Sequence, residues 1–137
     1  MALPPNQAKN LGLSPHDKMA TIETPSGEAW VVNEACAEQF EGFLKELEAT
    51  GYVCKSAGGY AYRKIRGGNS LSQHAYGNAI DVNADENPLG ATKNNFPPET
   101  AKLALKWGLS WGAEWRGRKD PMHFEVSRFL DEQSPSS

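Results

Sequence analysis

The sequence predicts an α+β domain in which helices flank a small antiparallel sheet. Short stretches alternate between apolar and polar residues as strands do, and two longer stretches have helical spacing and capping residues. These elements do not repeat as strand–helix–strand units, so a parallel sheet is not expected. A length of 137 residues suits one hydrophobic core but is short for two. We expect one domain over residues 21–132, after a loose arm over residues 1–20 and before a frayed tail over residues 133–137.

The first half of the domain is expected to contain a hairpin, a helix and a strand. Residues 21–24 and 29–32 flank a Pro-Ser-Gly turn, which is typical of a β-hairpin. Asn33 is a suitable N-cap for a helix that ends at Gly51. Residues 52–55 then have the composition of a strand. The helix has one apolar stripe, which contains Cys36, Phe40, Phe43, Leu44 and Leu47.

Two further strands are predicted in the second half by strict alternation. In residues 78–83 the apolar side chains alternate with Asp81, and in residues 122–126 they alternate with His123 and Glu125. If both strands lie in one sheet over a common core, Asp81 and His123 emerge together on the open face. Glu125 would then be close enough to accept a hydrogen bond from a histidine ring.

A second helix and a tryptophan-rich segment separate these two strands. Helix signals begin at residues 98–100 and end at Gly108, a residue that commonly stops a helix. Tryptophans then recur between residues 107 and 115, with Trp111 at the centre. Such residues could line a cleft around a substrate, but they more often pack in the core or in turns.

His74, Asp81 and His123 have the composition of a catalytic zinc site. Such a site takes three nitrogen or oxygen ligands from the protein and leaves one position for water. Gly77 allows the sharp turn that would bring His74 back toward Asp81. Asp120 is a further carboxylate, which could accept a proton from the water. From the pattern alone, the alternative is a set of solvated polar residues.

The segments around these residues resemble the motifs of zinc peptidases that cut bacterial cell-wall peptides. Residues 72–81, the first motif, meet every fixed position of Ser-x-His-x-x-Gly-x-Ala-x-Asp, and residues 120–123, the second motif, meet Asp-x-x-His. This family contains D-Ala-D-Ala carboxypeptidases and dipeptidases of the VanY and VanX type, and L-alanyl-D-glutamate endopeptidases of phage endolysins. The resemblance covers about residues 21–130 and implies the Hedgehog/DD-peptidase fold.

The resemblance implies one zinc ion per chain, held by the three ligands named above. It also implies that an arginine upstream of the first motif holds the substrate and stabilises the oxyanion. Arg63 matches that position best, and Arg66 is the alternative because the glycine-rich segment leaves the register open. Ser72, the first fixed residue of the first motif, is expected to position a ligand or the substrate.

The implied activity is hydrolysis of a peptide bond in the stem peptide of peptidoglycan, with Asp120 as general base and Glu125 beside a ligand. An L-alanyl-D-glutamate endopeptidase is our first choice, because Gly67, Gly68 and the Gly-Trp segment suggest an open groove. A D-Ala-D-Ala carboxypeptidase is the alternative within the family. The non-enzymatic alternative is a cell-wall or phage-tail structural module in which zinc only stabilises the fold. The His-Glu-x-x-His motif is absent, so a thermolysin-type enzyme is not expected.

Charge and hydropathy exclude some partners. The net charge is −3 and the isoelectric point about 5.6, which gives no basic surface for nucleic acid. No apolar stretch approaches the length of a membrane span, and we expect a monomer. No secretory signal is visible in the sequence. We therefore expect a location in the host cytoplasm with release to the cell wall, or carriage in a phage particle, unless a signal has been removed.

Two cysteines and one histidine are expected to have no part in the site. Cys36 and Cys54 are expected to be small buried hydrophobic residues, with a disulfide as the alternative if the protein matures outside the cytosol. Neither has the spacing of a zinc pair. His16 lies in the proline-containing arm, away from both motifs, so we expect it at the surface and not as a metal ligand.

Overall fold

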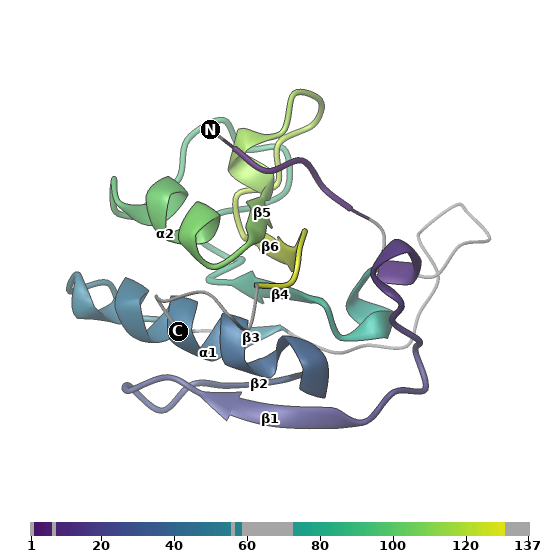
Figure 1. Cartoon of the computed structure of the whole chain (residues 1–137). Helices are drawn as coiled ribbons and strands as arrows, with labels where there is room; N and C mark the ends of the chain where they lie inside the picture. The colour runs from purple at the N-terminus through teal and green to yellow at the C-terminus, as the bar shows by residue number, and fades with distance from the viewer. Residues whose placement is uncertain (1, 7, 56, 59–72, 131–137) are drawn as a thin grey trace.

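The computed structural model describes residues 2–6, 8–55, 57–58 and 73–130 of the chain. Its described part contains two α-helices and two antiparallel sheets, which confirms the predicted α+β class (Figure 1). No helix in these ranges is long and apolar enough to cross a membrane. Three short 3-10 turns complete the elements: η1 (Ala8–Leu11), η2 (Gln73–Tyr76) and η3 (Gly112–Glu114).

The smaller sheet is the predicted hairpin. β1 (Met19–Glu23) pairs with β2 (Ala29–Asn33) on either side of the Pro-Ser-Gly turn. The helix α1 (Glu34–Ala49) follows directly. Asn33 caps this helix as predicted, because its Oδ1 accepts a hydrogen bond from Ala35 N (2.9 Å).

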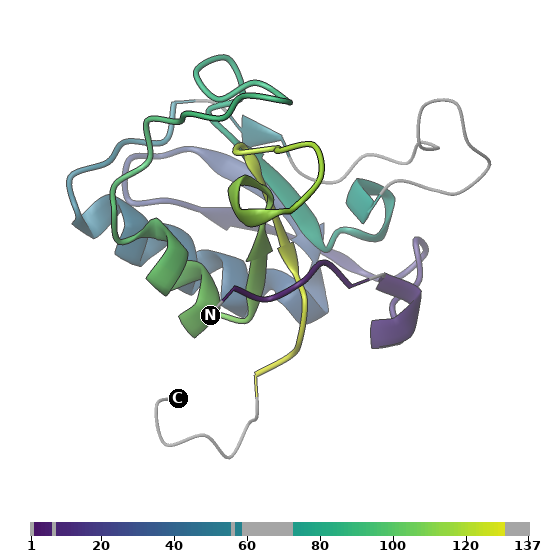
Figure 2. The same cartoon turned by 90° about the horizontal axis from the view of Figure 1, so that it is seen from above.

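The larger sheet has the strand order β3-β4-β6-β5 and is antiparallel throughout (Figure 1). Its members are β3 (Ala57–Gly58), β4 (Ala79–Val82), β5 (Leu109–Trp111) and β6 (His123–Val126). Both strands predicted from alternation are confirmed as β4 and β6, and they are neighbours. The predicted second helix is present as α2 (Thr100–Lys106), which leads into β5 and lies alongside α1 (Figure 2).

The hydrophobic core lies between α1 and the larger sheet. Phe43 of α1 packs against Phe124 of β6, with ring centroids 4.9 Å apart. The predicted apolar stripe of α1 is buried, and the hairpin also packs against this helix (Figure 1). Cys36 and Cys54 belong to this core as free thiols, and burial raises the pKa of each to about 12. They pack as small hydrophobic residues, as predicted.

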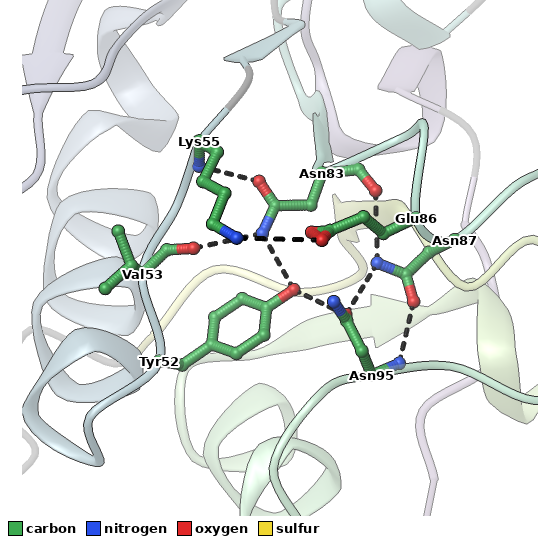
Figure 3. A network of polar contacts seen from close by, with 7 residues as sticks. All are labelled: Tyr52, Val53, Lys55, Asn83, Glu86, Asn87 and Asn95. Carbon is green, nitrogen blue, oxygen red and sulfur yellow. Dashed lines mark hydrogen bonds and ion pairs between the residues drawn. The ribbon is translucent and has the colours of Figure 1, made fainter.

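The strand predicted over residues 52–55 is wrong. The backbone of this segment bonds to a side chain instead of a neighbouring strand, because Asn83 Oδ1 accepts from Lys55 N (2.7 Å) and Asn83 Nδ2 donates to Val53 O (3.1 Å) (Figure 3). Asn83 has a φ of 49°, a left-handed conformation that asparagine tolerates better than most residues. The side chain of Asn83 therefore attaches the chain before β3 to the end of β4.

Two hydrogen bonds attach the segment before β1 to the end of β6. Ser127 Oγ donates to Pro4 O (2.6 Å), and Asn6 Nδ2 donates to Ser127 O (3.0 Å). The arm that the sequence predicts to be loose thus has contacts with the domain that its composition does not predict.

Glu48, near the end of α1, connects three segments of the chain. Its carboxylate accepts hydrogen bonds from Ser26 N (2.9 Å), Ser26 Oγ (2.6 Å) and Cys54 N (3.0 Å). Partial burial acts to raise the pKa of this carboxyl, but the bonds from Ser26 and Cys54 outweigh burial and hold the pKa below its ordinary 4.5. A carboxyl with a lowered pKa stabilises the fold above about pH 4.5, and this stability is lost as the pH falls through the lowered value.

We predict that Glu48→Gln lowers the free energy of unfolding by about 1 kcal/mol at pH 7, and by less at about pH 3. Urea unfolding of both proteins at the two pH values measures the difference. The control is Glu41→Gln on the exposed face of the same helix, which should change little at either pH. An equal loss in both variants, or a loss that does not depend on pH, would contradict the role given to Glu48.

Candidate functional site

The pairing of β4 with β6 places Asp81 opposite His123. Val82 N donates to Met122 O (2.9 Å), so Asp81 and His123 form a non-hydrogen-bonded pair of the ladder. In such a pair the facing side chains come closest together. His123 Nδ1 lies 3.4 Å from Asp81 Oδ1. The expectation that these two side chains share one face of the sheet is therefore confirmed, but the expectation that this face is open is wrong at His123, which is buried.

The other ring nitrogen of His123 faces Glu125. His123 Nε2 and Glu125 Oε1 are 2.8 Å apart, and the two residues are only 7% and 3% exposed. A carboxylate at this distance accepts a hydrogen bond, so the geometry assigns a proton to Nε2. Nδ1 is then the ring atom directed at Asp81. A carboxylate placed in this way fixes the orientation of a histidine that binds a metal through its other nitrogen.

Asp120 reaches the same ring nitrogen from the loop before β6. Its Oδ2 is 4.0 Å from His123 Nδ1, and its side chain is only 16% exposed. The backbone oxygen of Asp120 accepts from His123 N (3.0 Å), and the Asp120 N–H donates to Gly112 O (3.1 Å). Two carboxylates, one from β4 and one from this loop, therefore converge on one nitrogen.

The charges around His123 determine its protonation. Burial acts to lower the pKa of the imidazole, because it removes water from the charged form. Hydrogen bonds and attraction from Asp81 and Glu125 outweigh burial and raise the pKa to about 9. The carboxylates around the imidazole therefore favour positive charge at this position.

β2 holds the backbone of the first motif. Trp30 Nε1 donates to Asp81 O (3.1 Å), and Asn33 N donates to Gly77 O (2.8 Å). Gly77 has a φ of 74°, as expected for the sharp turn before β4. A side chain at Gly77 would also collide with the backbone of Asn33. The turn that leads into β4 is therefore fixed by a strand of the hairpin.

Several predicted site side chains lie outside the described part of the structure. His74 lies on η2, but its side chain is outside the described part of the structure, as are Arg63, Arg66 and Ser72 entirely. Among the described residues, no three His, Cys, Asp or Glu side chains form a group that could hold a metal ion. The oxygen and imidazole donors that converge at β4 and β6 are nevertheless of the types that zinc binds, which fits the predicted site. His16 is exposed, as expected.

Trp111 and Trp115 take different positions beside the site. Trp111 is 8% exposed, and its ring stacks on Phe124 in the core with centroids 5.7 Å apart. Of the two roles left open for Trp111, packing is the one that its position supports. Trp115 is the tryptophan that touches His123, with ring centroids 5.3 Å apart. The sequence does not single out Trp115, and its only signal is that it is the last tryptophan before the second motif.

Comparison with known proteins agrees with the two motifs. Residues 66–126 match the family model described as D-alanyl-D-alanine carboxypeptidase. The matched segment is a little under half of the chain, and it contains His74, His123 and the three carboxylates discussed above. No curated protein matches the chain. The resemblance stated from the motifs is confirmed, and the match indicates a peptidase.

Proposed function

We propose that the chain is a zinc metallopeptidase that hydrolyses a peptide bond in the stem peptide of peptidoglycan. One observation carries this proposal: Asp81 and Asp120 converge on Nδ1 of His123, within a segment that matches a peptidase family. Two carboxylates at one imidazole nitrogen supply both a metal ligand and a proton acceptor, which is what metal-assisted hydrolysis requires.

His74, Asp81 and His123 would hold the zinc ion. When bound, zinc supplies Lewis-acid chemistry, since it polarises a carbonyl group and makes water acidic near neutral pH. Glu125 accepts a hydrogen bond from Nε2–H of His123, which leaves Nδ1 available and holds the ring in one orientation. Trp115 packs beside the same ring and restricts its movement further.

Asp120 is the proposed general base. It lies on the Nδ1 side of His123, but it comes from the loop before β6 and not from the ladder that supplies Asp81. It can accept a proton from the attacking water and return it to the leaving amine while the ladder residues stay in place. Arg63 is proposed to stabilise the negative charge on the substrate oxygen, a role that rests on the resemblance alone.

The proposed scissile bond joins L-alanine to D-glutamate. An endopeptidase needs room for the peptide on both sides of the metal, and the neighbour of Asp81 on the edge strand β3 is Gly58, a residue without a side chain. The matched family model is described as a carboxypeptidase, so removal of D-alanine from the end of the stem peptide is the alternative. The two activities release different products and can be told apart directly.

We predict that the chain binds one zinc ion and that His123→Ala abolishes binding, because His123 Nδ1 is a proposed ligand. Elemental analysis of the purified variants measures the zinc content. His16→Ala is the control and should keep the metal, since His16 is exposed in the segment before β1. Unchanged zinc in His123→Ala would remove this histidine from the proposed metal site.

We predict that Asp120→Asn keeps the zinc ion but lowers kcat by about 10²- to 10⁴-fold, the usual contribution of a general base. The amide has the shape of the carboxylate but cannot accept the proton. Turnover of purified wall peptide and zinc content are measured on the same samples. Asp85→Asn, at an exposed position beyond β4, should leave kcat unchanged. Near-normal turnover in Asp120→Asn would place the base elsewhere, with Glu125 the first residue to test.

We predict that digestion of purified muropeptides separates L-alanine from D-glutamate, and mass spectrometry of the products identifies the bond. Release of D-alanine or of the D-Ala-D-Ala dipeptide, with the L-alanine link intact, would establish the carboxypeptidase alternative. A chain that binds zinc and releases no product would support the non-catalytic wall module.

A further inference from the structure

Gly112 lies against Asp120 more closely than any other residue type could. It begins η3 directly after β5, and its carbonyl oxygen accepts the hydrogen bond from Asp120 N (3.1 Å). A β-carbon at Gly112 would meet the carbonyl oxygen of Asp120, and would come within 2.9 Å of both its carbonyl carbon and its Cβ. Gly112 is not among the described glycines with positive φ. The close approach of Asp120, and not the backbone conformation, therefore requires glycine here.

Pro121, which follows Asp120, is also held by a residue of β5. Trp111 Nε1 donates to Pro121 O (2.7 Å), and this hydrogen bond is buried. The Trp111 ring is itself fixed, because it stacks on Phe124 of β6 in the core. Trp111 and Phe124 are also direct partners in the β5–β6 ladder. Trp111 and Gly112, at the end of β5, thus contact Pro121 and Asp120. β5 itself pairs with β6, the strand that carries His123.

We propose that Trp111 and Gly112 are positioning residues, which set the distance between the Asp120 carboxylate and His123. This inference rests on the proposed function, in which Asp120 is the general base. His123 lies on β6, and β6 pairs with β5, which ends at Trp111. Contacts from Trp111 and Gly112 therefore hold the loop residue Asp120 at a fixed position relative to His123. Placement matters for rate, since an error of about 1 Å in a catalytic group can cost about 10²-fold.

The experiment compares Gly112→Ala with Gly117→Ala. Gly117 lies in the loop between η3 and Asp120. A β-carbon there would have nothing within 4 Å, and its φ is not positive, so Gly117→Ala is a matched control. We expect Gly112→Ala to lower kcat by about 10- to 100-fold with little change in KM or zinc content. Gly117→Ala should keep the kcat of the parent chain. A Gly112→Ala protein that is folded and has unchanged kcat would overturn the inference.

A double-variant cycle separates positioning from a general loss of structure. If Gly112 acts through Asp120, adding Gly112→Ala to Asp120→Asn should lower kcat by no more than about 2-fold. A full additional loss in that background would overturn the inference. Should Gly112→Ala fail to fold, Trp111→Phe provides the same test, because it keeps an aromatic ring and removes the donor to Pro121 O.

A spectroscopic readout keeps this inference separate from the proposed function. The NMR signals of the His123 ring should shift in Gly112→Ala and stay in place in Gly117→Ala, whether or not the protein is active. Unshifted His123 signals in a folded Gly112→Ala protein would overturn the positioning role. If the parent chain hydrolyses no wall peptide, the proposed function fails, and the His123 signals still decide the placement of Asp120.

Discussion

The register of β4 against β6 is the constraint on which the site depends. A strand exposes alternate side chains on opposite faces, so Ile80 and Phe124 face the core in the same register that brings Asp81 opposite His123. A shift by one residue would put Asp81 into the core and an apolar side chain among the polar groups of the opposite face. Burial of each large apolar side chain contributes roughly 2 kcal/mol, which makes the shifted register unfavourable. Core packing therefore fixes the distance between two polar groups that lie outside it.

The balance of charge around His123 explains why three carboxylates can gather in a largely buried region. Asp81, Asp120 and Glu125 all face one ring, and burying like charges together is costly unless positive charge accompanies them. Asp81 and Glu125 raise the pKa of His123 despite its burial, and a proton on the ring would supply one positive charge among these carboxylates. A divalent cation would supply two, so the proposed zinc ion suits this set of carboxylates better than a proton does.

Helices and strands with a clear local hydrophobic pattern could be predicted from the sequence, whereas contacts between segments distant in the sequence could not. β4, β6 and α1 each have a strong internal pattern, and alternation alone grouped three of the site residues on one face. Residues 52–55 have the composition of a strand, but the side chains of Asn83 and Glu48 bond to their backbone in place of a neighbouring strand. Trp111 and Trp115 look equivalent in sequence, and only the pairing of β5 decides which one enters the core. The predictions that lie outside the described residues concern Arg63, Arg66, Ser72 and the side chain of His74.

Trp30 and Asn33 hold the first motif, yet both precede the segment that the family model matches. Asn33 also caps α1, so the hairpin, the helix and the turn into β4 share one side chain. A fragment trimmed to the matched residues would keep His74, His123 and the three carboxylates but lose the strand that holds the backbone of the first motif. The part of the chain that builds the site is therefore larger than the segment that the family model matches. Any truncation or fusion should retain the hairpin at residues 19–33.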